Sequence, residues 1–113
     1  MLKVYHNPRC RNSRAGVEFL KANGVDFTLV NYFKEPFTEE SLKRLLMKLN
    51  KKPEEIIRKH EEIYKSRFKG KEFTNDEWIK ILIEFPRLIK RPIIEREHKA
   101  VIGDPLENII SII

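Results

Sequence analysis

The sequence predicts an α/β protein with a mixed sheet, in the order β-α-β, a helical segment, then β-β-α. Two observations support this prediction: short β-branched and aromatic runs lie near both ends of the chain, and apolar residues at helical spacing fill its middle. The chain has 113 residues, 41% of them hydrophobic and 35% charged, which suffices for one compact domain with its own core. We therefore expect a single domain over residues 1–113, with a helical insertion at about 38–86.

The first third of the chain predicts a β-α-β unit. Residues 2–6 (LKVYH) form the first expected strand, and an Asn-Pro pair after them favours a turn. A helix is expected from Ser13 to the Asn-Gly pair that begins at Asn23. Residues 25–33 (VDFTLVNYF) are β-branched and aromatic, as in a second strand. A crossover of this length predicts that the two strands run parallel.

Helices are expected in the middle of the chain. The first covers residues 38–50, where Thr38 precedes an acidic first turn. The residue three positions after Thr38 is Ser41 instead of Glu or Gln, so a complete capping box is not expected. A shorter helix is predicted over residues 52–64, because a proline stands near its start. The last, residues 76–85, follows a Thr-Asn pair that can cap it and ends at a proline.

The last quarter of the chain returns to strands. Residues 92–97 (PIIERE) and 99–103 (KAVIG) flank a charged turn and predict an antiparallel hairpin. Residues 104–113 (DPLENIISII) predict a closing helix. Asp104 is its expected N-cap and Pro105 its expected first residue.

Composition limits the partners that we expect. The net charge of +6 favours anions such as small oxyanions or acidic thiols, although a solvated lysine-rich surface explains the charge alone more simply. The sequence contains no signal peptide and no run of the roughly 18 apolar residues that a membrane span needs. One cysteine cannot form an internal disulfide, which suits a reducing compartment. We expect a cytoplasmic protein with neither membrane nor nucleic acid as its partner.

The single cysteine, Cys10, lies between the first expected strand and helix, beside Arg9, Arg11 and Arg14. A thiol reacts as its thiolate, and its ordinary pKa near 8.5 leaves little thiolate at neutral pH. A helix N-terminus and nearby arginines both stabilise the anion, so we expect the pKa of Cys10 to be lowered. The competing interpretation is an inert cysteine packed at the end of a strand.

The residues at fixed distances after Cys10 distinguish between the possible reactions of its thiol. A phosphatase-type loop needs Cys-x5-Arg, but the position after five intervening residues is Gly16. A dithiol site needs Cys-x-x-Cys, but the second position is Ser13. A Cys-x-x-Ser site can form a mixed disulfide but cannot resolve it internally. Any redox cycle must therefore use an external thiol, such as glutathione, glutaredoxin or thioredoxin.

These residues resemble the glutaredoxin-coupled arsenate reductases of the thioredoxin-like superfamily. The opening YHNPRCRNSR is similar to the family signature His-Asn-Pro-x-Cys-x-x-Ser-Arg, and NYFKEPFTEESL, EEIIRKHEEIY and FPRLIKRPII resemble further family segments in the same order. The resemblance implies a thioredoxin-like fold with Cys10 as the nucleophile. It also implies that Arg58 and Arg91 bind the oxyanion substrate, for which guanidinium groups supply planar, paired donors.

The resemblance also implies a reaction. The Cys10 thiolate attacks arsenate and displaces hydroxide or water. Glutathione then attacks the adduct, arsenite leaves, and glutaredoxin reduces the remaining disulfide between Cys10 and glutathione. Glutathione is thus a co-substrate, and no tightly bound cofactor or metal is expected.

Several supporting residues have two interpretations. The resemblance implies a cis bond before Pro92, facing the cysteine. Ser13 either bonds the thiolate or caps the helix, and Arg14 adds positive charge on the same side. His6 either orients the thiol or is a polar group at the end of a strand. Arg58 has acidic neighbours, so a surface ion pair is its alternative role.

One residue departs from the family pattern. The reductases that the chain resembles carry a third arginine before a proline after the last strand, where this chain has Asp104. A thiol reductase of another substrate is therefore an alternative. So is a regulator of the Spx type, a related group that binds RNA polymerase. Many of those regulators use a Cys-x-x-Cys switch, which Ser13 interrupts here.

Overall fold

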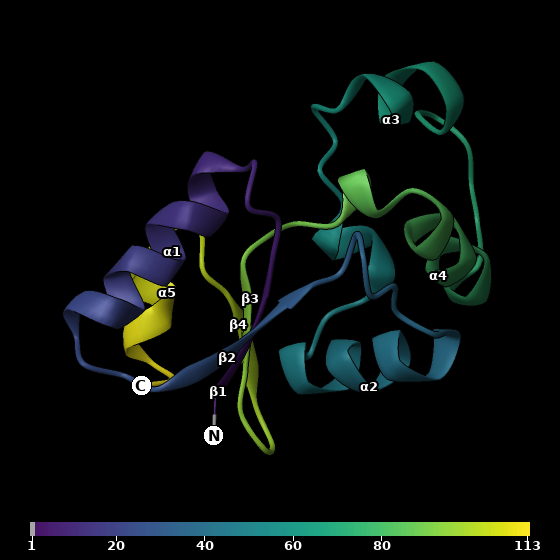
Figure 1. Cartoon of the computed structure of the whole chain (residues 1–113). Coiled ribbons are helices and arrows are strands. Elements are labelled where there is room, and N and C mark those ends of the chain that lie inside the picture. Colours follow the sequence, from purple (N-terminus) through teal and green to yellow (C-terminus); the bar gives the residue numbers. More distant parts are fainter. Residues whose placement is uncertain (1) are drawn as a thin grey trace. The chain divides into compact units, whose positions relative to one another are not determined.

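A computed structural model describes residues 2–113, and the chain divides into two compact units. The first unit comprises the residues up to Glu35 together with Arg91–Ile113, and the second comprises Pro36–Lys90. The first holds the sheet, and the expected helical segment, residues 38–86, lies within the second (Figure 1). Within residues 2–113, no helix combines the length and the apolar character that crossing a membrane requires.

The sheet of the first unit is mixed, as predicted. Its strands are β1 (Leu2–His6), β2 (Phe27–Asn31), β3 (Ile93–Glu95) and β4 (Ala100–Ile102), in the spatial order β2-β1-β3-β4. β1 pairs with β2 in parallel, and β3 pairs with both β1 and β4 in antiparallel orientation. β2 is shorter than the stretch 25–33 because each of its residues pairs with one of the five residues of β1. The predicted parallel pair and hairpin are both confirmed.

Two helices lie on one side of this sheet (Figure 1). α1 (Arg11–Ala22) begins two residues before Ser13, because Cys10 takes the N-cap position. α5 (Glu107–Ile110) lies beside it near the C-terminus. Residues of the sheet, of both helices and of the C-terminal end form one buried cluster: Leu2, Val4, Val17, Leu20, Ile94, Ile109 and Ile112. The apolar faces of helix and strand thus meet in a shared core, which fixes α1 on the sheet.

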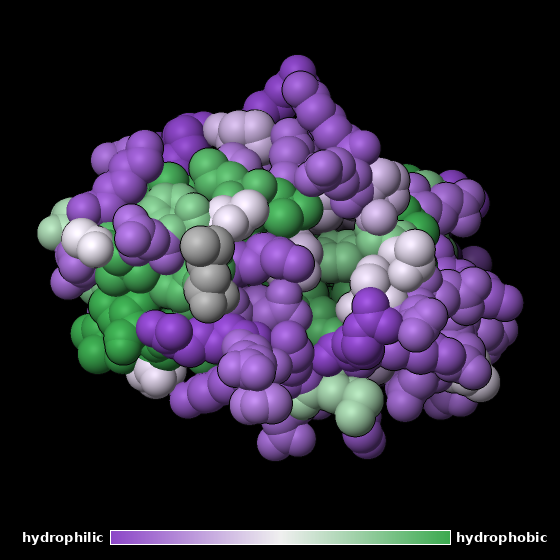
Figure 2. Space-filling view, turned by 60° about the horizontal axis from the view of Figure 1, so that its bottom comes forward, coloured by the Kyte–Doolittle hydropathy of each residue, from purple (hydrophilic) through white to green (hydrophobic). Residues whose placement is uncertain are grey.

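Apolar side chains also remain on the surface of this unit. Leu106, Ile110 and Ile113 are exposed near the C-terminus. In Figure 2, apolar side chains gather toward the side on which Figure 1 places α1 and α5.

The predicted cap of the last helix is wrong. Leu106, not Asp104, occupies the N-cap position of α5. The carboxylate of Asp104 instead accepts a hydrogen bond from the side-chain amide of Asn12, over 2.8 Å. Because this carboxylate is turned toward α1, it does not bond the first amides of α5, and the helix begins later than predicted. The peptide bond between Asp104 and Pro105 is cis.

The second unit is helical. It contains α2 (Glu39–Leu49), the 3₁₀ turn η1 (Pro53–Ile56), α3 (Glu62–Arg67), α4 (Asn75–Glu84) and the 3₁₀ turn η2 (Pro86–Leu88). The side chain of Trp78 is buried and packs against Phe68 and Phe73 in the core of this unit. Thr74 caps α4 through a capping box with Glu77.

The helix predicted over residues 52–64 does not form as one element. η1 ends at Ile56, and Ile57 forms an antiparallel bridge with Ile89. The amide of Arg58 donates to the carbonyl of Leu88 over 2.7 Å. Backbone groups that a helix would have bonded internally are therefore paired with another segment, and α3 begins only after this bridge.

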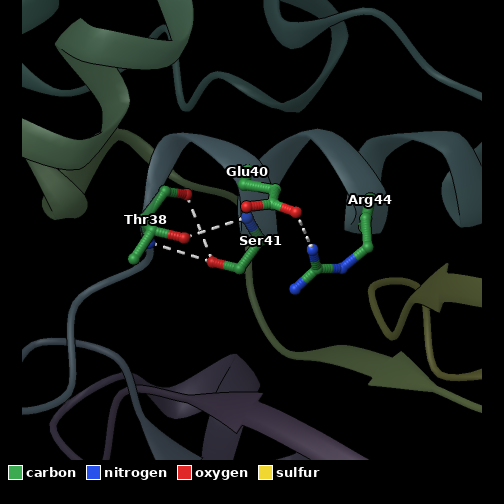
Figure 3. A network of polar contacts seen from close by, with 4 residues as sticks. All are labelled: Thr38, Glu40, Ser41 and Arg44. Atoms are coloured by element: carbon green, nitrogen blue, oxygen red, sulfur yellow. Dashed lines mark hydrogen bonds and ion pairs between the residues drawn. The ribbon is translucent and has the colours of Figure 1, made fainter.

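The start of α2 also differs from expectation, because a complete capping box forms there. The amide of Ser41 donates to the Thr38 hydroxyl over 3.0 Å, and the amide of Thr38 donates back to the Ser41 hydroxyl over 2.9 Å (Figure 3). Glu40 and Arg44 form an ion pair on the next turn. A serine hydroxyl thus performs the role that the capping box usually assigns to Glu or Gln.

Candidate active site

The sheet topology brings four chain segments of the first unit to one edge of the sheet. β1 and β2 are parallel, so their carboxyl ends meet there. β3 is antiparallel to β1 and begins at this edge, and β4 ends there because Ile102 pairs with Ile93. The segments that extend from the edge are residues 7–10, 32–33, 91–92 and 103–104. Carboxyl ends of strands in α/β sheets are the usual place for a ligand.

Cys10 stands where the first of these segments enters α1. It is the N-cap residue, with φ −93° and ψ 128°, and the residue is partly exposed. Its amide donates to the carbonyl of Asn7 over 2.9 Å, and its carbonyl accepts from the amide of Arg14 over 3.0 Å. The unpaired N–H groups and the dipole of a helix N-terminus stabilise an anion at this position. The expected position of Cys10 at the start of a helix is confirmed.

Ser13 fixes the loop that precedes the cysteine. Its side chain is fully buried, and its hydroxyl accepts a hydrogen bond from the amide of Asn7 over 3.1 Å. The side-chain oxygen of Asn7 in turn accepts from the amide of Arg9. Ser13 therefore does not cap the helix, since Cys10 is the N-cap and the hydroxyl bonds an amide of the preceding loop. A bond from Ser13 to the thiolate stays a prediction.

Arg14 folds back over the same loop. Its guanidinium donates to the carbonyl of Pro8 over 3.1 Å, although the residue is exposed. Arg9 and Arg11 are exposed as well. Three arginines, one before Cys10 and two in the first turns of α1, thus add their charge to the positive end of this helix.

Arg91 is buried in the same unit. Only 5% of it is exposed, and its guanidinium carbon lies 5.9 Å from the ring centroid of Phe33, which follows β2. A guanidinium over an aromatic face is attracted by the ring's charge distribution. The peptide bond between Arg91 and Pro92 is cis, as the resemblance implied.

Two glycines let Pro92 approach the helix that carries Cys10. A Cβ atom on Gly16 of α1 would lie 2.6 Å from Pro92 Cγ, and one on Gly103 would lie 3.0 Å from the same atom. The amide of Gly103 also donates to the Pro92 carbonyl over 2.7 Å. This role of the two glycines was not predicted from the sequence. A glycine inside a helical pattern, as at Gly16, is the signal that could have revealed a close approach.

His6 ends β1, one residue beyond the last pair of β1 and β3, which joins Tyr5 and Ile93. Partial burial lowers the pKa of His6 below its ordinary value of 6.5, because burial disfavours the charged imidazolium. The imidazole is therefore neutral at neutral pH. Its role toward the thiol stays a prediction.

Arg58 belongs to the second unit, and it does not lie in a helix. Its guanidinium forms an ion pair with Glu61 over 3.0 Å, and the two side chains are 16% and 17% exposed. A second guanidinium, that of Arg87, lies 3.7 Å from the other carboxylate oxygen of Glu61, and His60 lies 3.1 Å from Arg58. The ion-pair interpretation of Arg58 is thus correct, and its role as an oxyanion ligand stays a prediction.

The site contains thiol, guanidinium and amide groups. Within residues 2–113, no three side chains of His, Cys, Asp or Glu are grouped so that they could hold a metal ion. The order β-α-β then β-β-α, with a cysteine at the start of the first helix, is that of a thioredoxin-like thiol protein.

Comparison with known proteins assigns the family. Residues 5–112 match the model of the ArsC family. The chain is 34% identical to the uncharacterized protein YfgD of Escherichia coli, over 99% of this chain and 96% of that protein. It is 32% identical to an arsenate reductase of Neisseria meningitidis, over 99% and 97% of the two chains. The chain therefore belongs to the ArsC family.

The solved structures agree with this assignment. An arsenate reductase from Vibrio cholerae superposes with a TM-score of 0.92 at 31% identity, covering 99% of this chain and 97% of that one. The thioredoxin-like fold that the resemblance implied is confirmed.

Proposed function

We propose that the protein is a thiol-dependent oxidoreductase that reduces arsenate to arsenite through an adduct on Cys10. The observation that carries the proposal is the position of Cys10 at the N-terminus of α1, with Pro92 packed against Gly16 of the same helix. Arg91 directly precedes Pro92, and β3 begins at Ile93 opposite Tyr5 of β1, which supports Arg91 as a substrate-binding residue of the same site. The arsenate reductases among the relatives of this chain support the choice of substrate.

In the first step the thiolate of Cys10 attacks arsenic, an As–S bond forms, and an oxygen leaves as hydroxide or water. Negative charge builds up on the remaining oxygens during this attack. The amides at the start of α1 and the guanidinium groups of Arg91 and Arg58 are the proposed donors that stabilise it. Arg14, held over the loop by Pro8, adds positive potential near the entering anion.

In the second step an external thiol completes the reduction. Glutathione attacks the sulfur of Cys10, the S–S bond forms as the As–S bond breaks, and the electron pair leaves with arsenite. The chain has one cysteine, so it cannot displace glutathione from itself. Glutaredoxin is the proposed reductant of the mixed disulfide. The proposed reaction needs reduced glutathione, which the cytoplasm maintains, so we propose that the protein acts there.

The experiment is arsenate-dependent NADPH oxidation with glutathione, glutathione reductase and glutaredoxin supplied. The wild type should turn over, Cys10→Ser should not, and Arg91→Lys should lose roughly tenfold or more in kcat/KM because a point charge replaces a planar pair of donors. Arg44→Lys is the matched control, since this arginine is exposed and pairs with Glu40 on α2.

Two results would count against the proposal. Turnover by Cys10→Ser would exclude the adduct on Cys10. An inactive wild type whose thiol still reacts rapidly with alkylating reagents would exclude arsenate, and would favour another substrate or the polymerase-binding regulator.

A further inference from the structure

Asp104 places a carboxylate beside the helix turn that carries the nucleophile. Its Oδ2 accepts a hydrogen bond from Nδ2 of Asn12 over 2.8 Å. Asn12 is the second residue of α1, and Cys10 is the N-cap of that helix. Two residues of helix and one hydrogen bond therefore separate the carboxylate from the thiol, a distance on the order of 10 Å.

Helix capping does not explain this position. Asp104 is not the N-cap of α5, which is Leu106, and its bond to Asn12 is exposed. An exposed hydrogen bond of this kind contributes little to stability. What the residue does contribute is a negative charge at the end of α1 where the dipole, Arg9, Arg11 and Arg14 are all positive.

We propose that Asp104 is a specificity-determining residue of the Cys10 site, which lowers the preference of the thiol for anionic over neutral substrates. This inference rests on the proposed function of Cys10 as the nucleophile. The arginines and the helix dipole make the potential at the thiol positive, and the carboxylate reduces this potential, so it weakens the attraction of an anion by an amount that grows with the charge of that anion. The carboxylate therefore disfavours a doubly charged substrate more than a singly charged one, and it leaves a neutral substrate unaffected.

The test compares two alkylating reagents that differ in charge. Iodoacetate is an anion and iodoacetamide is neutral, and in both reactions the thiolate displaces iodide as a C–S bond forms. The ratio of their rate constants at one pH does not depend on the thiolate fraction, because this fraction affects both rates equally. The ratio therefore reports the potential at the thiol and not its pKa.

Asp104→Asn should raise the ratio of the iodoacetate rate to the iodoacetamide rate by roughly two- to fivefold at low salt, the effect of one unit charge about 10 Å away through solvent. The change should shrink toward none at about 0.5 M salt, where screening extends over only a few ångströms. Asp104→Glu keeps the charge and should retain the wild-type ratio.

Glu18→Gln is the matched control. This exposed glutamate lies farther along α1, next to Lys21, and the substitution removes the same charge at a greater distance from Cys10. A smaller effect than that of Asp104→Asn is expected. Equal ratios in Asp104→Asn and wild type, or equal shifts in both variants, would overturn the inference.

Failure of the proposed function has a different signature. If Cys10 reacts with both reagents no faster than a free thiol, the site lacks an activated nucleophile, and the ratio still reports whether Asp104 sets the local potential.

Discussion

At the scale of single residues, Cys10 is distinguished by its position at the N-terminus of α1. It is the N-cap residue of α1, and the hydrogen bond from the amide of Asn7 to the hydroxyl of Ser13 holds the preceding loop in place. A cysteine in such a position ionises more readily than a free thiol.

The first prediction concerns this ionisation. The rate of iodoacetamide alkylation of Cys10, measured against pH, should show its inflection below the ordinary thiol value of about 8.5. Free glutathione under the same conditions is the control. An inflection at the value of the control would contradict the activated thiolate.

A second prediction concerns His6. Burial lowers the pKa of His6 in the folded state below its ordinary value of 6.5. Below pH 6.5 the unfolded state therefore binds a proton at this residue more readily than the folded state does. The stability that the neutral imidazole contributes is therefore present above pH 6.5 and is lost as the pH falls through the lowered pKa. His6→Gln should reduce the loss of unfolding free energy between about pH 7.5 and 5.5, measured by urea denaturation.

His98→Gln is the control for this measurement, because the His98 side chain is 89% exposed in the turn between β3 and β4. If His6→Gln and the wild type lose equal free energy over this pH range, burial of His6 does not contribute to acid sensitivity.

At the scale of elements, Pro92 packs closely against α1, the helix that begins directly after Cys10. Gly16 gives α1 the room to pack on the proline ring, and Gly103 does the same at the end of β4. The helix that carries Cys10 and the segment that carries Arg91 are positioned by this contact.

A third prediction follows from it. Gly16→Ala should destabilise the protein by about 1–3 kcal/mol, because the new Cβ would lie 2.6 Å from Pro92 Cγ. Helix propensity alone would give the opposite sign, by about 1 kcal/mol. Urea denaturation measures the stability, and alkylation of Cys10 should slow as the loop shifts.

Gly24→Ala is the matched control. Gly24 has φ +66°, and a Cβ added to it would meet no atom within 4 Å, so its substitution strains the backbone only. This variant should lose stability but keep the wild-type rate of Cys10 alkylation. A more stable Gly16→Ala would show that α1 can move away from Pro92 without penalty.

At the scale of the whole molecule, the second unit lies in the chain between β2 and β3 of a single sheet. Each unit falls below about 60 residues, a size at which an isolated domain is marginally stable. The single domain expected over residues 1–113 stays a prediction.

A fourth prediction tests it. Thermal unfolding should give one transition, with equal calorimetric and van't Hoff enthalpies, because neither unit is large enough to be stable alone. Fluorescence of Trp78, which lies in the second unit, and far-ultraviolet circular dichroism should report the same midpoint. Two separate midpoints would show that the units fold independently.

The sequence by itself determined the elements whose signals are local. The strand at residues 2–6, the helix after Thr38 and the hairpin near the C-terminus follow from periodicity and turn residues that act within a few positions. The place of Cys10 at the start of a helix was predictable for the same reason.

Only the tertiary structure decided the features that depend on distant segments. The helix predicted over residues 52–64 is interrupted because Ile57 pairs with Ile89. Asp104 bonds Asn12 instead of capping α5, and Gly16 is required by Pro92. In each case the partner lies more than 30 residues away, so no local pattern of the sequence identifies which residue it is.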